Sequence, residues 1–250
     1  MKVSIITATY NCVSVIEDCL VSVAGQSYEN IEHIVIDGSS TDTTLEVLQN
    51  HRHALTKIVS EPDGGIYDAL NKGIAYSSGE IIGFLHSDDV FSTKDVLKNV
   101  VSIFEADDSV SAVYGDLVYV QRSMPDKVVR TWRSSSFSPN FLKNGWMPPH
   151  PTLYVRRDWY ERIGGFDTRY RIAADYFSIL QLFSQPYFKA VYLPEVIINM
   201  RLGGASNRSL GAIFRKSLED WDALRRSGFG VFGASRALLL KNLSKVSQFY

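Results

Sequence analysis

The sequence is poor in cysteine and nearly balanced in charge. Only Cys12 and Cys19 occur among its 250 residues, and the net charge is −1. On one helix, seven residues apart, the two Cα atoms would lie about 10 Å apart, which is too far for a disulfide. We therefore expect free thiols and a cytoplasmic protein. The balanced charge leaves no broad basic field, so no nucleic-acid partner is expected.

Long apolar runs and glycine-rich phosphate loops are also missing. No segment approaches the roughly 20 apolar residues that cross a bilayer, and the N-terminal apolar segment is far too short for a signal peptide. Neither Gly-x-Gly-x-x-Gly after the first apolar segment nor Gly-x-x-x-x-Gly-Lys-Ser/Thr occurs. Both absences disfavour dehydrogenases and P-loop enzymes. A phosphorylated ligand would instead need a metal ion, a helix N-terminus or a few arginines.

The sequence does contain a regular alternation of apolar segments and helical patterns. In the first 90 residues it predicts strands at 3–7, 31–36, 57–60 and 81–85, and helices at 15–23, 44–48 and 66–76. The later residues predict strands at 110–114, 117–121, 128–133, 152–155 and 190–193, and helices at 158–163, 174–183 and from 210 onward. The early alternation indicates an α/β fold with a parallel sheet, and residues 128–133 read as an antiparallel addition.

Polar loops follow the four early strands, at residues 7–11, 37–42, 61–65 and 87–89. The carboxyl ends of parallel strands share one edge of a sheet, where ligands bind. One such loop would mean little, because Asp, Ser and Gly are common in turns. Four together predict a polar pocket.

The last of these loops places Asp88 and Asp89 directly after an apolar run. Two adjacent carboxylates repel each other unless a positive charge lies near them. A divalent cation that carries a phosphorylated ligand would supply that charge. The alternative is a solvated cap for a helix beginning near residue 92, because Ser and Asp are preferred at helix N-termini.

Five segments in order resemble the family 2 inverting glycosyltransferases of the GT-A fold. They are Ser4–Asn11, Asp37–Asp42, His86–Asp89, Gly164–Asp167 and Ala173–Tyr176. The resemblance covers residues 3–206. Within the family, the sequence looks most similar to bacterial members that build surface polysaccharides. It implies a Rossmann-like, mostly parallel sheet flanked by helices, with a smaller antiparallel element in the C-terminal half.

The resemblance also implies a reaction and a domain plan. The reaction is inverting, metal-dependent transfer of a hexose-type sugar from a UDP- or GDP-sugar to a hydroxyl of a saccharide or lipid-linked acceptor. The plan is a catalytic domain at 1–209, with a donor half (1–90) and an acceptor half (91–209), and a helical extension at 210–250. A sugar-nucleotide pyrophosphorylase and a non-catalytic nucleotide-sugar-binding protein are the alternatives.

The resemblance implies roles for residues on the donor side. Thr7, Thr9 and Asp37 would frame the nucleoside, with Asp63 at the base or ribose and Lys72 at a phosphate. Each of the last three has a plainer alternative. Asp37 would be a cap or turn residue, Asp63 would shape its own Asp-Gly turn, and Lys72 would be a solvated surface lysine.

The reacting groups follow from the same resemblance. Asp89 would bind Mg²⁺ or Mn²⁺, which stabilises the leaving diphosphate as a Lewis acid, and Asp88 would contact the ribose or donor sugar. Arg201 stands where many family members carry a histidine, so it would contact a phosphate from a closable loop rather than bind the metal.

Asp175 would be the base that takes the acceptor proton, unless it only caps a helix starting at 176.

Two further residues and the C-terminal segment remain open. His150 and Trp146 would bind the acceptor, or would be a structural hydrogen-bonder and a packing residue. Residues 232–250 combine leucines with basic residues. They would form an amphipathic helix at the inner face of the plasma membrane, or pack on the domain or on a second subunit.

Overall fold

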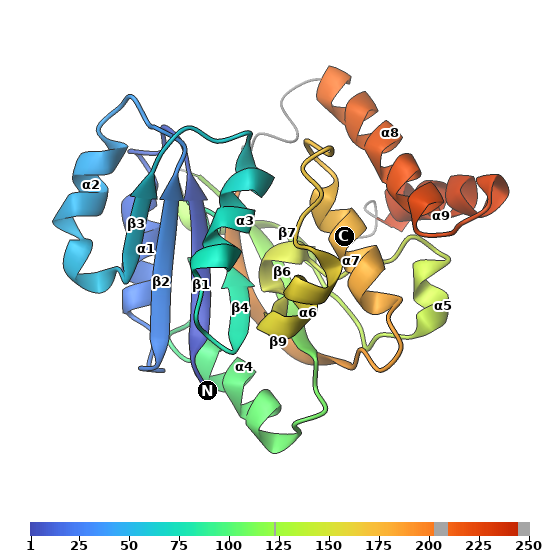
Figure 1. Ribbon diagram of the computed structural model, residues 1–250, viewed down its shortest axis with the longest axis horizontal. Coiled ribbons are helices and arrows are strands. Elements are labelled where there is room, and N and C mark those ends of the chain that lie inside the picture. Colours follow the sequence, from blue (N-terminus) through green and yellow to red (C-terminus); the bar gives the residue numbers. More distant parts are fainter. Residues whose placement is uncertain (123, 203–209, 245–250) are drawn as a thin grey trace.

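A nine-stranded sheet forms the middle layer of the computed structural model, which describes residues 1–122, 124–202 and 210–244 (Figure 1). The strand order is β3-β2-β1-β4-β8-β6-β9-β5, and β7 pairs with β6 outside this path. The strands are β1 (Val3–Thr9), β2 (Ile31–Asp37), β3 (Lys57–Ser60), β4 (Ile81–Phe84), β5 (Val90–Phe91), β6 (Ala112–Gln121), β7 (Met124–Trp132), β8 (Tyr154–Arg156) and β9 (Ala190–Arg201).

The direction of the strands confirms a mostly parallel sheet with antiparallel additions. β1 pairs in parallel with β2 and β4, and β2 with β3. β8 is antiparallel to both β4 and β6, so β6 and its parallel partner β9 run the same way as β1. β5 and β7 are antiparallel to their neighbours. The loops after β1, β2, β3 and β4 therefore emerge at one edge, as the sequence predicts.

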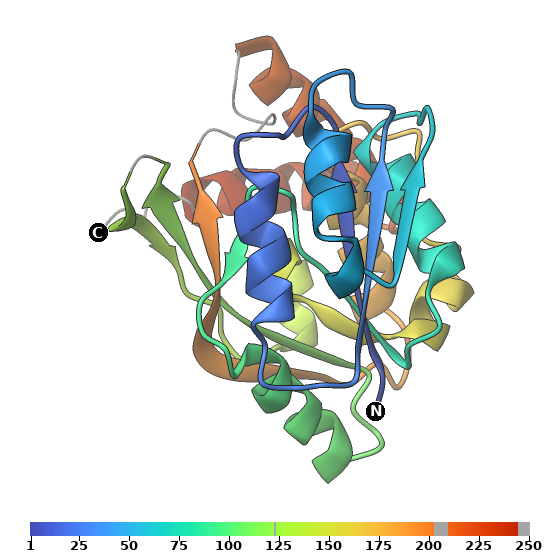
Figure 2. The same ribbon diagram turned by 90° about the vertical axis from the view of Figure 1, so that its left-hand side faces the viewer.

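Helices cover both faces of the sheet. On one face α1 (Ile16–Ala24), α2 (Thr44–Asn50) and α4 (Val96–Ala106) share an apolar cluster, and Figure 2 shows α1 and α2 in front of the strands. On the other face lie α3 (Ile66–Tyr76), α6 (Arg157–Ile163) and α7 (Ala174–Phe183). The described chain also forms α5 (Pro139–Leu142), short 3₁₀ helices at Arg52–Ala54 and His150–Thr152, α8 (Leu210–Arg226) and α9 (Val231–Ser244).

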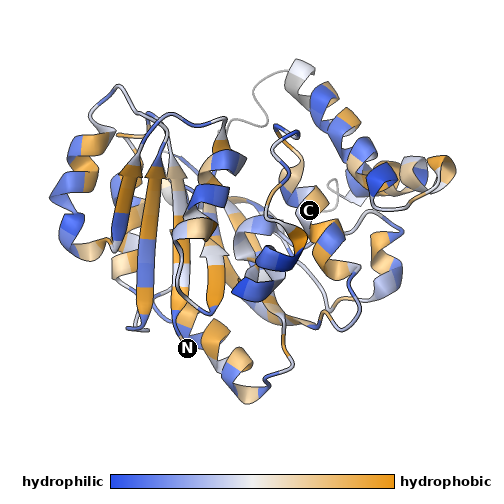
Figure 3. Ribbon diagram, in the orientation of Figure 1, coloured by the Kyte–Doolittle hydropathy of each residue, from blue (hydrophilic) through white to orange (hydrophobic). Residues whose placement is uncertain are grey.

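Apolar spacing explains the local structure. Ile16, Cys19, Leu20 and Val23 recur at helical intervals on α1 and are all buried, which is the stripe that a helix on a sheet requires. β1 and β4 are buried throughout because they have helices on both faces, and Figure 3 shows hydrophobic residues in orange along the strands of the sheet. Both cysteines are free, as expected. However, Cys12 precedes α1, so the assumption that the two share one helix is wrong.

Two strand predictions for the later residues are wrong. Residues 112–121 form one strand through Gly115 rather than two, and β9 continues to Arg201 instead of ending near 193. The pairing explains both. Tyr114 pairs with Tyr192 and Asp116 with Val196, so three residues of β9 bulge opposite Gly115. Pro194, which has no N–H to donate, lies in that bulge, and the ladder resumes beyond it.

The C-terminal helices pack on the domain. Ala223, Leu224, Ala234 and Ala237 are buried in the apolar cluster that also contains α6 and α7, and Figure 1 shows α8 and α9 beside α7. Packing on the domain is thus the arrangement that the described residues show. Within those residues, no helix combines the length and apolar character of a membrane span. The expected contact with a membrane surface or a second subunit stays a prediction.

Candidate active site

The loops after β1 and β2 are fastened together at the predicted edge. The Asn11 backbone N–H donates to Ser40 Oγ at 2.8 Å, and Asn11 Oδ1 accepts from the Thr41 backbone N–H at 2.8 Å. Asn11 takes the left-handed conformation, with φ of 50°, which asparagine tolerates better than most residues. The two loops therefore form one wall of the edge.

Asp37 and Asp63 meet beside this wall. Asp37 is fully buried and accepts from the Ser40 backbone N–H at 3.0 Å and from Ser60 Oγ at 2.7 Å. A Cβ added to Gly38 would lie 2.6 Å from Asp63 Oδ2, so the Asp63 carboxylate lies against the Gly38 backbone. Asp63 Oδ1 also accepts from the Gly65 backbone N–H at 2.8 Å, which is the predicted turn contact. The alternative that Asp37 and Asp63 are turn residues therefore agrees with contacts that the structure contains.

The two threonines of β1 have different surroundings. Thr7 is fully buried and its hydroxyl lies 3.0 Å from His33 Nε2, so the structure places that hydroxyl inside the domain. Thr9, the last residue of β1, pairs with Asp37 in register. Its buried Oγ1 has no hydrogen-bond partner among the described residues. Of the two threonines, Thr9 is thus the one whose hydroxyl has no partner among the described residues.

Lys72 lies in the same region but faces carboxylates. Its Nζ is 2.8 Å from a Glu61 carboxylate oxygen and donates to the Pro62 carbonyl at 3.0 Å. Hydrogen bonding to Glu61 raises the pKa of Lys72. The lysine therefore braces the loop between β3 and α3, and its predicted phosphate contact would require it to leave this pairing.

The Asp88-Asp89 pair follows the buried end of β4. The Asp89 backbone N–H donates to the His86 carbonyl at 3.0 Å, which closes a tight turn. Residues 90 and 91 then form β5, and α4 starts only at Val96 with Asp95 before it. The alternative that the pair caps this helix is therefore wrong.

Asp89 is an unpaired buried carboxylate. Its side chain is 1% exposed, and neither carboxylate oxygen has a hydrogen-bond partner in the described part of the chain. Burial, and after it the charge of Asp88, raises the pKa of Asp89 well above its ordinary value, while Arg201 opposes the shift. A buried carboxylate is costly unless it is paired or binds a cation, so this position fits a metal ligand.

The residues that the structure describes contain no group of three or more His, Cys, Asp or Glu side chains that could hold a metal. Mg²⁺ is commonly bound by one or two carboxylates together with substrate phosphates rather than by an all-protein cage. Asp89 fits that arrangement. Arg201, at the end of β9, is 10% exposed and pairs with Asp18. The loop predicted to close beyond it, residues 203–209, lies outside the described residues.

Asp175 lies in the first turn of α7 and is oriented by hydrogen bonds. The Tyr67 hydroxyl lies 2.7 Å from the Ile172 carbonyl and 3.2 Å from Asp175 Oδ1, so its one proton is shared between these two acceptors. The Tyr176 backbone N–H donates to Asp175 Oδ1 at 2.7 Å. The helix begins at 174, and Ala173 occupies the N-cap position. Asp175 is therefore inside the helix rather than at the expected cap.

Two imidazoles connect the two acidic groups. The ring centroids of His86 and His150 are 6.1 Å apart, and Phe84 stacks on His150 at 5.6 Å. Burial lowers the pKa of His150 to about 4, against the opposing charge of Asp175. Burial also lowers the pKa of His86, against the charges of Asp88 and Asp175. Neutral imidazoles thus lie within electrostatic reach of both acidic groups.

Each imidazole has an unused nitrogen. His86 Nδ1 and His150 Nε2 have no hydrogen-bond partner in the described part of the molecule. A neutral imidazole nitrogen can donate or accept according to its tautomer. Both nitrogens are buried, and the acceptor role of His150 stays a prediction.

The Gly-Gly-Phe-Asp motif links α3 to the segment between α6 and α7. Asn71 on α3 donates to the Phe166 carbonyl and accepts from the Phe166 backbone N–H, both at 2.8 Å. Gly165 has φ of 73°, and a Cβ there would lie 2.5 Å from Asn71 Oδ1. Phe166 in turn contacts the rings of Tyr67 and His150 at 5.5 and 5.6 Å. The glycine is required by this close approach.

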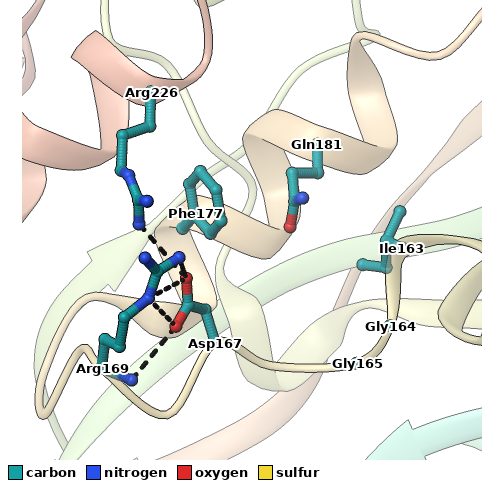
Figure 4. A pocket seen from close by; sticks show the side chains of 8 residues that line it. All are labelled: Ile163, Gly164, Gly165, Asp167, Arg169, Phe177, Gln181 and Arg226. Atoms are coloured by element: carbon teal, nitrogen blue, oxygen red, sulfur yellow. Dashed lines mark hydrogen bonds and ion pairs between the residues drawn. The ribbon is translucent and has the colours of Figure 1, made fainter.

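Trp146 and one described cavity lie elsewhere. Trp146 packs with Phe137 at 5.5 Å and with Phe183 at 5.7 Å, which is the packing alternative. A cavity of about 410 Å³ is lined by residues on and around α6 and α7, shown in Figure 4. It contains none of the predicted site residues, and Asp167 inside it already pairs with Arg169 and Arg226.

Four residues of this region were not predicted as site residues: Tyr67, Asn71, His86 and Glu219. His86 adjoins the acidic pair, so its place in the motif was a usable signal. Tyr67 and Asn71 lie on the helix after the third polar loop, which is a weaker signal. Glu219 hydrogen-bonds the residues before α7 from α8, and nothing local in the sequence indicates that contact.

The chain is similar to known glycosyltransferases. Residues 4–168 match Glycosyl transferase family 2. An uncharacterized glycosyltransferase of Mycobacterium tuberculosis is 34% identical over 244 residues, which are 95% of this chain and 89% of the relative.

Two solved structures share the fold. S. aureus TarS in complex with UDP-GlcNAc has a TM-score of 0.70 at 18% identity, covering 97% of this chain and 72% of TarS. The mannosyltransferase of Pyrobaculum calidifontis, in complex with GDP-Man and Mn²⁺, has a TM-score of 0.68 at 21% identity, covering 99% and 72%.

The family match covers most of the sheet and all four polar loops, and the mycobacterial relative extends the likeness over nearly the whole chain. The alternatives of a pyrophosphorylase and a non-catalytic binding protein lose their support. The chain belongs to glycosyl transferase family 2 and is a glycosyltransferase with the GT-A fold.

Proposed function

We propose that this glycosyltransferase moves a sugar from a UDP- or GDP-sugar to a hydroxyl group, with inversion and with the help of Mg²⁺ or Mn²⁺. One observation carries the proposal. Asp89 is a buried carboxyl group without a hydrogen-bond partner among the described residues, and the hydrogen-bonded Asp175 lies within electrostatic reach of both His86 and His150.

The nucleoside would lie at the ends of β1 and β2. Thr9 offers an unpaired hydroxyl there, and Asp63 presents a carboxylate beside Gly38. Asp37 holds this wall through its hydrogen bonds to Ser40 and Ser60. The complexes of the two structural neighbours with UDP-GlcNAc and GDP-Man support a nucleotide-sugar donor.

The diphosphate would lie toward the Asp88-Asp89 turn. Asp89 would hold the metal, and Asp88, which is less buried, would contact the ribose or the donor sugar. A bound divalent ion neutralises charge on the departing diphosphate. Arg201, near Asp89 at the end of β9, would contact the same phosphates and would have to leave its ion pair with Asp18 to do so. The Mn²⁺ in the mannosyltransferase complex supports this choice of metal.

Asp175 would accept the proton of the attacking hydroxyl. Tyr67 keeps its own proton, because burial, reinforced by the charge of Asp175, raises its pKa well above the ordinary value. It therefore acts as a fixed donor that orients the carboxylate. A single base that activates the acceptor is what a direct displacement with inversion needs, and His86 and His150 would orient sugar hydroxyls beside it.

We further propose a saccharide or lipid-linked acceptor in bacterial polysaccharide biosynthesis, and action in the cytoplasm. The test is a panel of UDP- and GDP-sugars incubated with Mn²⁺, Mg²⁺ or a chelator, with release of nucleoside diphosphate as the signal. Release that requires both one donor and a divalent ion is expected, and NMR of the product should show inverted anomeric configuration. Equal release in the chelator, or a retained configuration, would overturn the corresponding part.

A further inference from the structure

The segment that carries the proposed base has no cap of its own. Ala173 is the N-cap residue of α7, and no side chain of that position bonds the helix. Instead, Glu219 of α8 accepts two hydrogen bonds from the peptides just before the helix. The backbone N–H groups of Ile172 and Ala173 donate to Glu219 Oε2 at 2.8 and 3.0 Å. A carboxylate at a helix N-terminus is also favoured by the helix dipole.

The Ile172 residue is held from two sides. Its backbone N–H donates to Glu219, and its carbonyl accepts from the Tyr67 hydroxyl at 2.7 Å. The same hydroxyl lies 3.2 Å from Asp175 Oδ1. A shift of this peptide would therefore move the donor that orients the carboxylate.

Other contacts fix α8 and α9 against the same part of the domain. Lys241 Nζ lies 2.9 Å from Asp220 Oδ1 and 3.2 Å from the centroid of the Tyr176 ring, next to Asp175. Lys241 is 5% and Asp220 2% exposed. Asp222 accepts from the Tyr170 hydroxyl at 2.6 Å. The helix that presents Glu219 is thus itself firmly seated.

We infer that Glu219 is a positioning residue for catalysis, and that the C-terminal helices complete the active site by fixing the start of α7. This rests on the proposed role of Asp175. The acceptor side of the reaction depends on a contact made 44 residues further along the chain, so the helical extension is part of the catalytic unit.

The test uses four variants of the full chain: Glu219→Ala, Glu219→Gln, Glu219→Asp and Asp222→Ala. Glu219→Ala removes the acceptor, and we expect kcat to fall about tenfold to a hundredfold while the donor KM stays within about twofold. Glu219→Gln keeps an oxygen that can accept both bonds, so kcat should recover to within about threefold of the parent. Thermal unfolding reports whether each variant is folded.

Two variants separate positioning from stability. Asp222→Ala breaks the side-chain hydrogen bond to Tyr170 but keeps both bonds from the Ile172 and Ala173 N–H groups to Glu219, so it should lower the unfolding midpoint and leave kcat near the parent value. Glu219→Asp keeps the charge but shortens the side chain, and it should lower kcat even if Glu219→Ala does not fold.

The outcomes also separate this inference from the proposed function. Equal losses in Glu219→Ala and Glu219→Gln, or parental kcat in Glu219→Asp and Glu219→Ala, would overturn the positioning role. If Asp175→Asn retained transfer, the base assignment itself would be wrong. If Asp175→Asn abolished transfer while Glu219→Ala kept it, only the positioning role would fail.

Discussion

The turn after β4 and the first turn of α7 both present an acidic group, but they hold it in opposite ways. Asp89 is buried and neither of its oxygens has a partner among the described residues. Asp175 is half-buried and accepts from Tyr67 and from the Tyr176 backbone N–H. The positive charge nearest the first carboxylate, Arg201, is paired with Asp18, whereas the second carboxylate is already oriented by hydrogen bonds.

This difference separates two kinds of task. An unpaired buried carboxylate raises the free energy of the folded protein when no ligand is bound, and a bound cation would lower it. An oriented carboxylate at the mouth of a helix is prepared to take a proton without rearrangement. We therefore assign ligand binding to the β4 turn and proton chemistry to α7, and the following changes test that division.

The largest effect is expected from Asp175→Asn. An amide of the same shape cannot accept a proton from the sugar hydroxyl, so kcat should fall by about 10²- to 10⁴-fold. Donor binding should change little, because in the proposed arrangement the donor is held by the loops after β1, β2 and β4. Steady-state kinetics with separate donor and acceptor titrations measure both. A parental kcat would remove the proton role from α7.

Lys241→Met should have the next largest effect, on stability. It leaves Asp220 buried without its cation, which typically costs about 3–5 kcal/mol of unfolding free energy. The double variant Lys241→Met with Asp220→Leu should recover much of this loss, because it removes both charges. Urea unfolding of the two variants and the parent measures the difference. Equal instability of the single and double variants would show that packing, not charge, is responsible.

His150 should make the protein sensitive to acid. Its pKa is lowered to about 4 by burial, whereas an unfolded histidine titrates near 6.5. Between these values the unfolded chain binds more protons, so stability is lost as the pH falls from about 6.5 to 4. Urea unfolding at several pH values should show a weaker acid dependence in His150→Gln than in the parent. An unchanged slope would mean that the imidazole is charged in the folded state.

The smallest effect is expected from Asn71→Ala. It removes the two hydrogen bonds to Phe166, and a loss of about 1–3 kcal/mol is expected because both peptide groups are part-buried. Asn71→Asp keeps the acceptor for the Phe166 N–H but sets a carboxylate oxygen against the Phe166 carbonyl, so it should be destabilised as well. An unfolding free energy of either variant equal to that of the parent would contradict this account of the motif.

The sequence predicted the fold and the strand-end edge well because both follow from local pattern. Each early strand is a short apolar run followed by a polar loop, and parallel pairing then brings those loops together. Asp37, Asp63 and Asp89 were found in this way at the edge where the structure has them. Their individual roles remain predictions.

What could not be predicted depends on side-chain direction and on distant contacts. Thr7 and Lys72 occur in the right segments, yet Thr7 faces His33 inside the domain and Lys72 faces Glu61. β9 continues past Pro194 because Gly115 on another strand permits a bulge. Glu219 on α8 contacts the backbone just before α7, although it lies more than 40 residues beyond that point in the sequence. None of these has a signature in its own segment.

The central claim is that Asp89 binds a divalent ion together with a nucleoside diphosphate. Isothermal titration calorimetry of UDP and GDP, with Mn²⁺ and with a chelator, tests it most directly on the parent and on Asp89→Asn. We expect binding by the parent only with Mn²⁺, and at least about tenfold weaker binding by Asp89→Asn, whose fold is checked by thermal unfolding. Equal affinity with and without Mn²⁺, or in parent and variant, would contradict it.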